Sequence, residues 1–226
     1  MYNYKVAVIT ANFGNYDTIK EPINIKNIEL FDWYYFTDNK DIKSDVYKVI
    51  NESHHIPGKP VLCAKYYKIQ HHKIDFIQKY DYIVWHDSSF YIQNVNFVND
   101  ILELLKGDPK FVLYKHPQRT TITQEVSVLN RMRKFSGQNF NAQLSKYTND
   151  GFTDNKGLYS LGFFIRKINS DINKLFDDWF YEITTCTVRD QVSFPYILWR
   201  HDVTPNIVIQ DNINNNKLIG KLGNHK

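Results

Sequence analysis

Short apolar runs alternate with segments of helical periodicity along the 226 residues of this chain. Apolar runs bounded by polar residues are typical of buried strands, and they occur at residues 6–10, 33–37, 82–85, 111–115 and 158–166. Strands that alternate with helices favour a layered α/β fold. We therefore expect a single Rossmann-related α/β domain in which helices flank a mostly parallel central sheet.

Helical periodicity marks the segments between these strands. Residues 64–80 carry an apolar face and, beside it, a face with Lys65, Lys68 and His72. Residues 171–183 repeat apolar side chains at the i, i+3, i+4 and i+7 spacing, which predicts the clearest helix of the chain. Further helices are expected at about residues 96–106, 121–135 and 140–147.

Composition and charge narrow the class of protein. The residues are 42% hydrophobic and 23% charged, which is ordinary globular content. A net charge of +4 is too small for a dedicated nucleic-acid binder. Two widely separated cysteines, Cys63 and Cys186, argue against a disulfide scaffold or a zinc ribbon and favour a reduced compartment.

The chain shows no membrane-span or secretory pattern and no internal division. Its apolar stretches are much shorter than the roughly 18 residues of a membrane span, and no secretory signal opens the sequence. We therefore expect a cytoplasmic protein. No repeat or linker interrupts the chain, so we expect one domain over residues 1–211 and a polar tail over residues 212–226.

Asp87 is the most informative polar residue, because it lies at the carboxyl end of the predicted strand at 82–85. In open α/β sheets, ligands bind beyond the carboxyl ends of the strands. A carboxylate there is suited to a divalent cation that bridges phosphate oxygens, with His86 and Ser89 as neighbours. The alternative is an ordinary aspartate that forms a turn or begins a helix.

Basic side chains follow other predicted elements. Lys65 and Lys68 share a helical face and are suited to neutralising a diphosphate, although such a face is commonly just solvated. His116 and Arg119 follow the strand at 111–115. A guanidinium at that place suits bidentate recognition of phosphate or carboxylate, and the alternative is a surface loop.

Arg189-Asp190-Gln191 places opposite charges side by side and follows them with an amide. Asp190 and Gln191 are suited to positioning sugar hydroxyls or to facing a reacting sugar carbon. The alternative is a helix start with Asp190 near the positive end of the helix dipole. The sequence has no GxGxxG after a strand, GxxxxGK[ST], HExxH or GxSxG motif, which disfavours dinucleotide oxidoreductases, P-loop enzymes, zincins and α/β-hydrolases.

Four blocks in chain order resemble a family of glycosyltransferase-like domains, long catalogued as a domain of unknown function. Each block alone is a weak signal, whereas all four in this order form a fairly specific one. The blocks cover residues 10–17 with 36–38, 64–72 with 82–87, 115–119 with Glu125, and 189–196.

The resemblance implies a GT-A-like fold, a nucleoside-diphosphate sugar donor (UDP-sugar first), a glycan or glycoconjugate acceptor, and a divalent metal, Mn²⁺ or Mg²⁺. Asp87 would take the place of the metal-binding Asp-x-Asp motif. The resemblance implies that the base and ribose pocket is lined by Asn12, Tyr16, Asp17 and Asp38, and that Lys65 and Lys68 face the donor. The further candidate donor-binding residues are Thr10, His116 and Arg119.

The Asp87-Ser88-Ser89 segment has one carboxylate where the full motif has two. We therefore expect either a weaker metal affinity or a metal shell completed by another ligand, from Ser89, His86, His201 or the tail residue His225.

Two mechanisms stay open for the transfer. An inverting enzyme needs a base, for which Asp190 is the first candidate and Glu125 the second. A retaining enzyme would use Gln191 or Asp190 to stabilise the oxocarbenium-like centre. Two other function classes also remain: a non-catalytic carbohydrate- or nucleic-acid-binding module, and a metal-dependent hydrolase with the same site.

Overall fold

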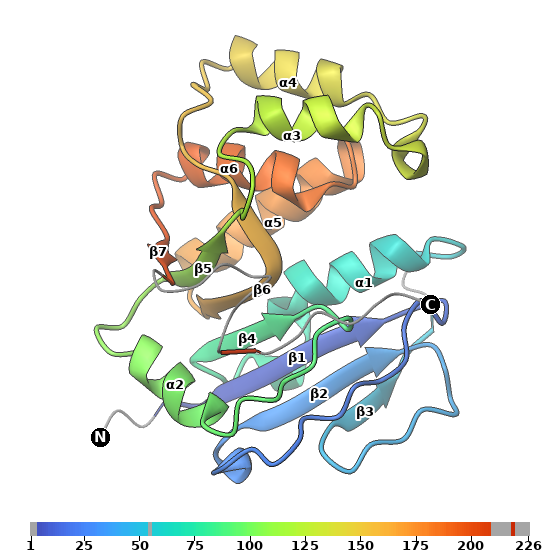
Figure 1. The fold of residues 1–226 in the computed structure, drawn as a ribbon, viewed down its shortest axis with the longest axis vertical. Helices are drawn as coiled ribbons and strands as arrows, with labels where there is room; N and C mark the ends of the chain where they lie inside the picture. The colour runs from blue at the N-terminus through green and yellow to red at the C-terminus, as the bar shows by residue number, and fades with distance from the viewer. Residues whose placement is uncertain (1–3, 54–55, 209–217, 220–226) are drawn as a thin grey trace.

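The computed structural model describes residues 4–53, 56–208 and 218–219. These residues form a seven-stranded sheet of order β3-β2-β1-β4-β6-β5-β7 (Figure 1). Strands β1 to β4 are parallel, whereas β6 is antiparallel to both β4 and β5. The predicted mostly parallel sheet is confirmed. The strands are β1 (Val6–Asn12), β2 (Asp32–Thr37), β3 (Lys48–Asn51), β4 (Tyr82–His86), β5 (Phe111–Lys115), β6 (Tyr159–Lys167) and β7 (Asn206–Ile207).

Helices and apolar clusters cover both faces of the sheet, as is usual for parallel strands. Alternate residues of β1 point to opposite faces, so Ala7 and Ile9 join one cluster and Val6 and Val8 the other. The first cluster packs against α1, α3, α4, α5 and α6, and the second against α2 (Figure 1). The helices are α1 (Pro60–Ile69), α2 (Phe97–Leu104), α3 (Ile122–Leu129), α4 (Phe140–Asn149), α5 (Ser170–Thr185) and α6 (Asp190–Arg200).

The helix expected over residues 64–80 is shorter than its periodicity indicates. It ends at Ile69 and continues as two 3-10 turns, His71–Lys73 and Asp75–Ile77. The Nδ1 atom of His71 lies 3.0 Å from the carbonyl oxygen of Lys68, which therefore has a side-chain partner in the last turn. Because α1 ends before His72, this residue does not lie on the helical face of Lys65 and Lys68. The expectation that it shares that face was wrong.

The structure shows side-chain capping at the N-terminus of α3. The Thr121 hydroxyl accepts from the Gln124 backbone N–H at 3.2 Å, and the Gln124 side chain accepts from the Thr120 N–H at 2.9 Å. The helix nevertheless ends at Leu129 rather than near residue 135, and a 3-10 turn at Arg133–Phe135 follows.

Part of the expected polar tail belongs to the core. Leu218 and Ile219 are buried in the second apolar cluster, and the carbonyl oxygen of Ile219 accepts from the Gln93 N–H at 3.1 Å. The remaining residues of the predicted tail lie outside the described ranges, so its boundary stays a prediction. Among the described residues, none of the helices has both the length and the apolar character that crossing a membrane requires.

Three buried histidines predict that the fold is sensitive to mild acid. Burial lowers the pKa of His72 and His86 to about 4 and that of His71 well below its ordinary value. Below about pH 6.5 the unfolded chain protonates these rings while the folded chain keeps them neutral. The contribution of these histidines to the free energy of unfolding is therefore fully present above that pH. It decreases as the pH falls toward about 4, by about 1.4 kcal/mol per pH unit for each histidine. Urea unfolding at a series of pH values measures this slope.

His72→Gln isolates one contribution, because glutamine keeps a hydrogen-bonding group opposite Asp177, whose carboxylate lies 3.0 Å from the His72 ring. We expect this variant to reduce the slope by about one histidine's share, or 1.4 kcal/mol per pH unit. An unfolding free energy that is flat from about pH 6.5 to 4.5 would contradict the prediction.

Candidate functional site

Four charged side chains meet at the carboxyl end of β4, and we call them the charged cluster. Lys65 and Lys68 extend from α1, Asp87 follows β4, and Asp190 is the first residue of α6. In Figure 1, α1, α5 and α6 lie on the same side of the sheet, so α1 and the start of α6 approach this edge together. It is also the edge at which open α/β sheets bind their ligands.

The ammonium group of Lys68 joins the two carboxylates of the charged cluster. Its Nζ lies 2.8 Å from Oδ2 of Asp190 and 3.2 Å from Oδ1 of Asp87. Lys65 also donates to Oδ2 of Asp190. The Lys68 side chain is only 4% exposed, whereas that of Asp87 is 44% exposed. Asp87 is therefore the carboxylate of this cluster that solvent or a substrate reaches.

The charges of the cluster stabilise one another. Burial by itself would raise the pKa of Asp190, but the positive charges of Lys65, Lys68 and Arg189 lower it well below its usual range. Burial opposes the charge of Lys68, yet the carboxylates of Asp190 and Asp87 outweigh it and raise the pKa of Lys68. For Lys65 burial prevails, and its pKa is lowered. At neutral pH the protein thus holds an ionised Asp190 against a protonated Lys68.

Asp190 is poorly suited to the role of general base that the sequence indicated. It is 3% exposed, and its Oδ2 accepts from both lysines. A carboxylate with so low a pKa is also a weak proton acceptor. We therefore revise its role to that of an anchor for the two ammonium groups. The next residue, Gln191, has a buried Oε1 that accepts no hydrogen bond within the described ranges.

Neighbouring strands hold Asp87 in place. The indole N–H of Trp85 donates to Oδ1 of Asp87 at 2.9 Å, and the Asp87 backbone N–H donates to the Gly162 carbonyl of β6 at 2.7 Å. A Cβ atom on Gly162 would lie 2.7 Å from the Phe90 ring and 3.2 Å from Oδ2 of Asp87. Only glycine fits at this position without displacing Phe90 or Asp87.

Gly162→Ala is therefore expected to destabilise the protein by about 1–3 kcal/mol, the usual cost of an overpacked interior. The rigid Phe90 ring gives way less easily than a flexible side chain, so the strain extends to the segment that carries Asp87. Urea unfolding measures the loss. Ser160→Ala, at a buried position of the same strand, is the matched control and should cost less. Equal stability of Gly162→Ala and the wild type would show that the ring moves freely.

The segment after β4 is tied to the loop after β1. The Ser88 hydroxyl donates to Oδ2 of Asp17 at 2.8 Å, and Lys20 donates to the Ser88 carbonyl at 3.2 Å. No local pattern in the sequence indicates these contacts of Ser88 and Lys20, because the bonded residues lie 71 and 68 positions apart along the chain. Ser89, the expected metal neighbour, is buried.

The residues expected around the base and ribose organise one loop. Asn12 and Asp17 bond reciprocally, with the Asp17 N–H donating to Oδ1 of Asn12 at 3.2 Å, and the Gly14 N–H donates to the Asp38 carboxylate at 3.0 Å. Tyr16 lies exposed on the same loop. These side chains hold the loop beside the segment of Ser88 that follows β4.

Thr10 does not line that loop. The side chains of β1 alternate, and the register with β4 places Thr10 on the same sheet face as Val8 and His86. Thr10 is 1% exposed there, and its hydroxyl accepts no hydrogen bond from the described residues. Because no surface of Thr10 is accessible, we withdraw it from the expected donor-binding residues.

A second charged group lies beside the charged cluster, and we call it the guanidinium pair: Arg119 and Arg189 held by Glu125. Oε2 of Glu125 accepts from Nε of Arg119 at 2.5 Å, and Oε1 accepts from Nε of Arg189 at 3.0 Å. Arg189 immediately precedes Asp190, so the two groups are contiguous. His116, whose pKa burial lowers, lies with its Nε2 3.0 Å from Nη2 of Arg119.

Glu125 is fully buried and both of its oxygens are occupied. The structure therefore contradicts its expected role as a base that contacts the acceptor, and we revise it to a positioning residue. The guanidinium pair retains exposed surface, since the Arg119 and Arg189 side chains are 20% and 26% exposed. Two guanidinium groups side by side are suited to an anionic ligand.

A family model described as the TOD1/MUCI70 glycosyltransferase-like domain matches residues 1–223. The chain belongs to this family. No curated protein matches the chain. Membership in the TOD1/MUCI70 family confirms the resemblance found in the sequence and supports a general glycosyltransferase role for the domain.

The expected metal ligands of this TOD1/MUCI70 domain do not converge. His86 points to the sheet face opposite Asp87, where its Nε2 lies 3.0 Å from the Tyr47 hydroxyl. His201 follows the last residue of α6, about 16 Å along the helix axis from Asp190, and its Nε2 lies 2.8 Å from Asp178. His201 is thereby excluded as a ligand beside Asp87. His225 lies outside the described residues.

The donor set at Asp87 therefore does not fit a divalent metal. Within residues 4–53, 56–208 and 218–219, no three His, Cys, Asp or Glu side chains are grouped in a way that could hold a metal ion. Asp87 contributes a single carboxylate, and an ammonium group already lies 3.2 Å from its Oδ1. Hard divalent cations need several oxygen ligands, so we derive no step of the reaction through a metal.

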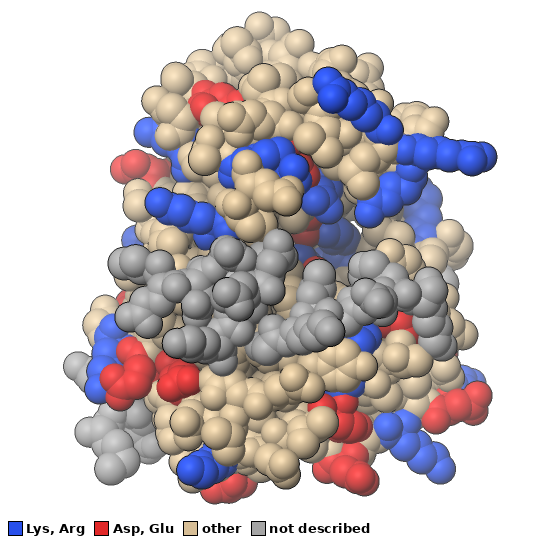
Figure 2. All heavy atoms as spheres, viewed as in Figure 1, with Lys and Arg blue, Asp and Glu red and all other residues tan. Residues whose placement is uncertain are grey.

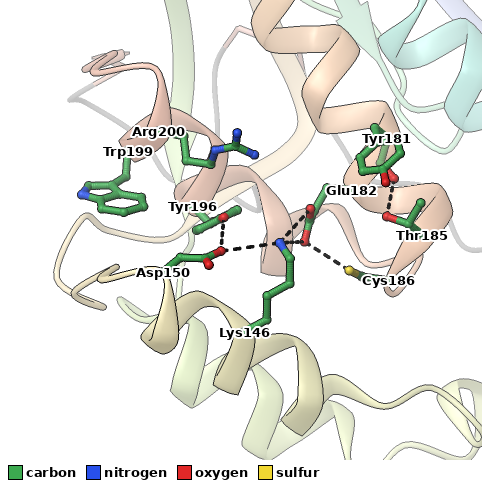
Figure 3. A pocket seen from close by; sticks show the side chains of 9 residues that line it. All are labelled: Lys146, Asp150, Tyr181, Glu182, Thr185, Cys186, Tyr196, Trp199 and Arg200. Carbon is green, nitrogen blue, oxygen red and sulfur yellow. Dashed lines mark hydrogen bonds and ion pairs between the residues drawn. The ribbon is translucent and has the colours of Figure 1, made fainter.

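A separate pocket of about 900 Å³ lies among α4, α5 and α6 (Figure 3). Its charges pair with each other, since Lys146 lies 3.1 Å from Glu182 and the Tyr196 hydroxyl donates to Asp150. Trp199 and Arg200 line it from the C-terminal end of α6, whereas the charged cluster is at the N-terminal end. The pocket is therefore distinct from the candidate site.

Basic and acidic side chains are unevenly distributed over the face drawn in Figure 2. Lys and Arg predominate in its upper part, where Figure 1 places α3 and α4, and Asp and Glu predominate in the lower part. Glu125, which holds the guanidinium pair, comes from α3. An anionic ligand is favoured there over the acidic part.

Proposed function

We propose that this protein transfers a sugar from a nucleoside-diphosphate sugar to a hydroxyl group of a glycan or glycoconjugate. The single observation that carries the proposal is the charged cluster, in which two ammonium groups and the start of α6 meet at the carboxyl edge of the sheet. The leaving group of this reaction is a diphosphate, whose developing charge is stabilised by such groups.

The proposed reaction breaks one bond and forms one. The acceptor hydroxyl oxygen attacks the anomeric carbon, and the bond from that carbon to the diphosphate oxygen breaks with its electron pair on the diphosphate. Lys65 and Lys68 stabilise that charge. Asp87 accepts the hydroxyl proton, because it has the exposed carboxylate of the charged cluster. The Gln191 side chain turns its buried Oε1, which has no partner within the described ranges, toward the donor and accepts a hydrogen bond from a sugar hydroxyl.

Two neighbouring groups complete the proposed donor site. The end of β1 with the loop after it, which includes Asn12, Tyr16 and Asp17, contacts the base and ribose together with Asp38, which follows β2. UDP is the first nucleotide to test. Its proximity to the charged cluster, through Ser88 and Asp17, supports this placement. The guanidinium pair adds positive charge for the diphosphate beside Asp190.

A thermal-shift panel of UDP, GDP, CMP and UDP-sugars tests this proposal. A ligand that binds only the folded state at about 100 times its Kd raises the free energy of unfolding by about 2.7 kcal/mol. We expect one nucleotide and its sugar conjugate to raise the melting temperature. AMP serves as a control for unspecific binding of phosphate. The absence of a shift with every nucleotide would reject the proposed function.

A further inference from the structure

We propose that the transfer needs no divalent metal, because the Lys68 ammonium group, with Lys65 beside it, occupies the position between Asp87 and Asp190 that a bridging cation would take. This inference rests on the proposed function and specifies how the same site stabilises the leaving diphosphate.

The Lys68 ammonium group lies between the two carboxylates, 3.2 Å from Oδ1 of Asp87 and 2.8 Å from Oδ2 of Asp190. A cation coordinated by both carboxylates would have to occupy the same space. The ammonium group is held on the second side by Asp190, which is itself nearly buried. Displacing it would leave a lysine without its partners in the interior.

The charged cluster has no excess of negative charge to attract a divalent cation. Two ammonium groups balance two carboxylates in the free protein, and the cluster lies at the N-terminus of α6, next to Arg189. A divalent cation added here would lie beside a protonated Lys68 and would be repelled by it. A diphosphate, in contrast, brings the negative charge that these ammonium groups and the helix N-terminus attract.

Lys65 is the more accessible of the two lysines. Its side chain is 18% exposed, whereas that of Lys68 is 4% exposed, and Asp190 anchors its ammonium group. Lys65 and Lys68 are one helical turn apart on α1 and both donate to Oδ2 of Asp190. During transfer, the electron pair of the broken carbon–oxygen bond goes to the diphosphate oxygen, and these two ammonium groups donate hydrogen bonds to that diphosphate.

The decisive experiment measures UDP binding and UDP-sugar turnover after dialysis against EDTA and again with added Mn²⁺. We expect Kd and turnover to agree within about twofold between the two conditions. Binding or turnover only with Mn²⁺ would overturn this inference and leave the proposed function standing. A protein that binds no nucleotide of the panel in either condition would overturn the proposed function, and this inference with it.

Substitution of the lysines tests the same inference independently of the metal titration. Lys65→Met and Lys68→Met should each weaken UDP binding in EDTA by about tenfold or more, the loss expected for a charged hydrogen bond. Lys73→Met, at the exposed lysine just after α1, is the matched control and should bind UDP as the wild type does.

The variants also separate a structural role from a direct one. If Lys68→Met fails to fold, the more exposed Lys65→Met still tests the proposal, and Lys65→Arg should restore part of the affinity. Recovery of Lys68→Met by Mn²⁺ would support the inference, because the cation would then occupy the space between Asp87 and Asp190 that the ammonium group leaves. Unchanged UDP affinity in both methionine variants would overturn it.

Discussion

Asp87→Asn is expected to lower donor turnover by about a hundredfold or more while the protein stays folded. The change keeps Oδ1 as an acceptor for Lys68 and Trp85, which lie 3.2 Å and 2.9 Å from it, but it removes the negative charge and the proton acceptor. The loss of one preorganised electrostatic contact in an active site commonly costs about 10²–10³ in turnover. The measurement is the rate of nucleoside-diphosphate release from the bound nucleotide sugar, at saturating donor.

Asp81→Asn is the matched control, because Asp81 lies at the opposite end of β4 and accepts from the Lys5 N–H at 2.7 Å. Asparagine keeps that acceptor, so this variant should turn over as the wild type does. The melting temperatures of the two variants show whether either effect arises from unfolding. Wild-type turnover in a folded Asp87→Asn protein would refute the assignment of Asp87. A rate that Mn²⁺ changes in the wild type but not in Asp87→Asn would instead show that Asp87 binds a metal.

The fold follows from the sequence where the pattern is local. Strands β1, β4 and β5 are buried on both faces, so their apolar runs are continuous and easily found. Strand β3 is exposed at its ends and half-buried between them, and β7 has two residues, so neither has a pattern to find. The reversed direction of β6 depends on its neighbours and leaves no mark in its own residues.

Helix α1 shows where local periodicity fails. The apolar pattern continues to residue 80, yet the helix ends at Ile69. The side chain of Gln70 donates to the Phe176 carbonyl at 3.0 Å, and His72 pairs with Asp177 of the same helix, α5. These partners lie 106 and 105 positions away, and tertiary contacts of this kind override helix propensity.

The sequence predicts which residues form the candidate site, but it does not predict which of their charged groups pair with one another. Lys65, Lys68, Asp87 and Asp190 are grouped by the motifs, and the structure places their charged groups within hydrogen-bonding distance. Which charges pair depends on side-chain geometry that no spacing encodes. Because Lys68 rather than a cation joins the carboxylates, Asp190 changes from an expected base to an anchor. The role assigned to Glu125 also changes from base to positioning residue, because two arginines donate hydrogen bonds to its carboxylate oxygens.

Asp190→Asn is expected to have the largest combined effect on stability and activity. It removes the charge that the buried Lys68 and the partly buried Lys65 share. Breaking a buried ion pair from one side costs about 3–5 kcal/mol, because the remaining charges stay in the interior. Donor turnover should fall by about a hundredfold or more at a temperature where the variant is folded, since both ammonium groups lose their anchor. Urea unfolding and nucleoside-diphosphate release measure the two effects.

The pH profile distinguishes an anchor from a purely structural residue. The carboxylate of Asp190 is the main group that raises the pKa of Lys68 against the effect of burial. Without it the pKa of Lys68 falls, so the alkaline limb of the turnover profile should move to lower pH in Asp190→Asn. Asp178→Asn, at the exposed partner of His201, is the matched control and should change stability by no more than about 1 kcal/mol. An unmoved alkaline limb would mean that Lys68 does not act on the donor in its protonated form, and the charged cluster would then serve stability alone.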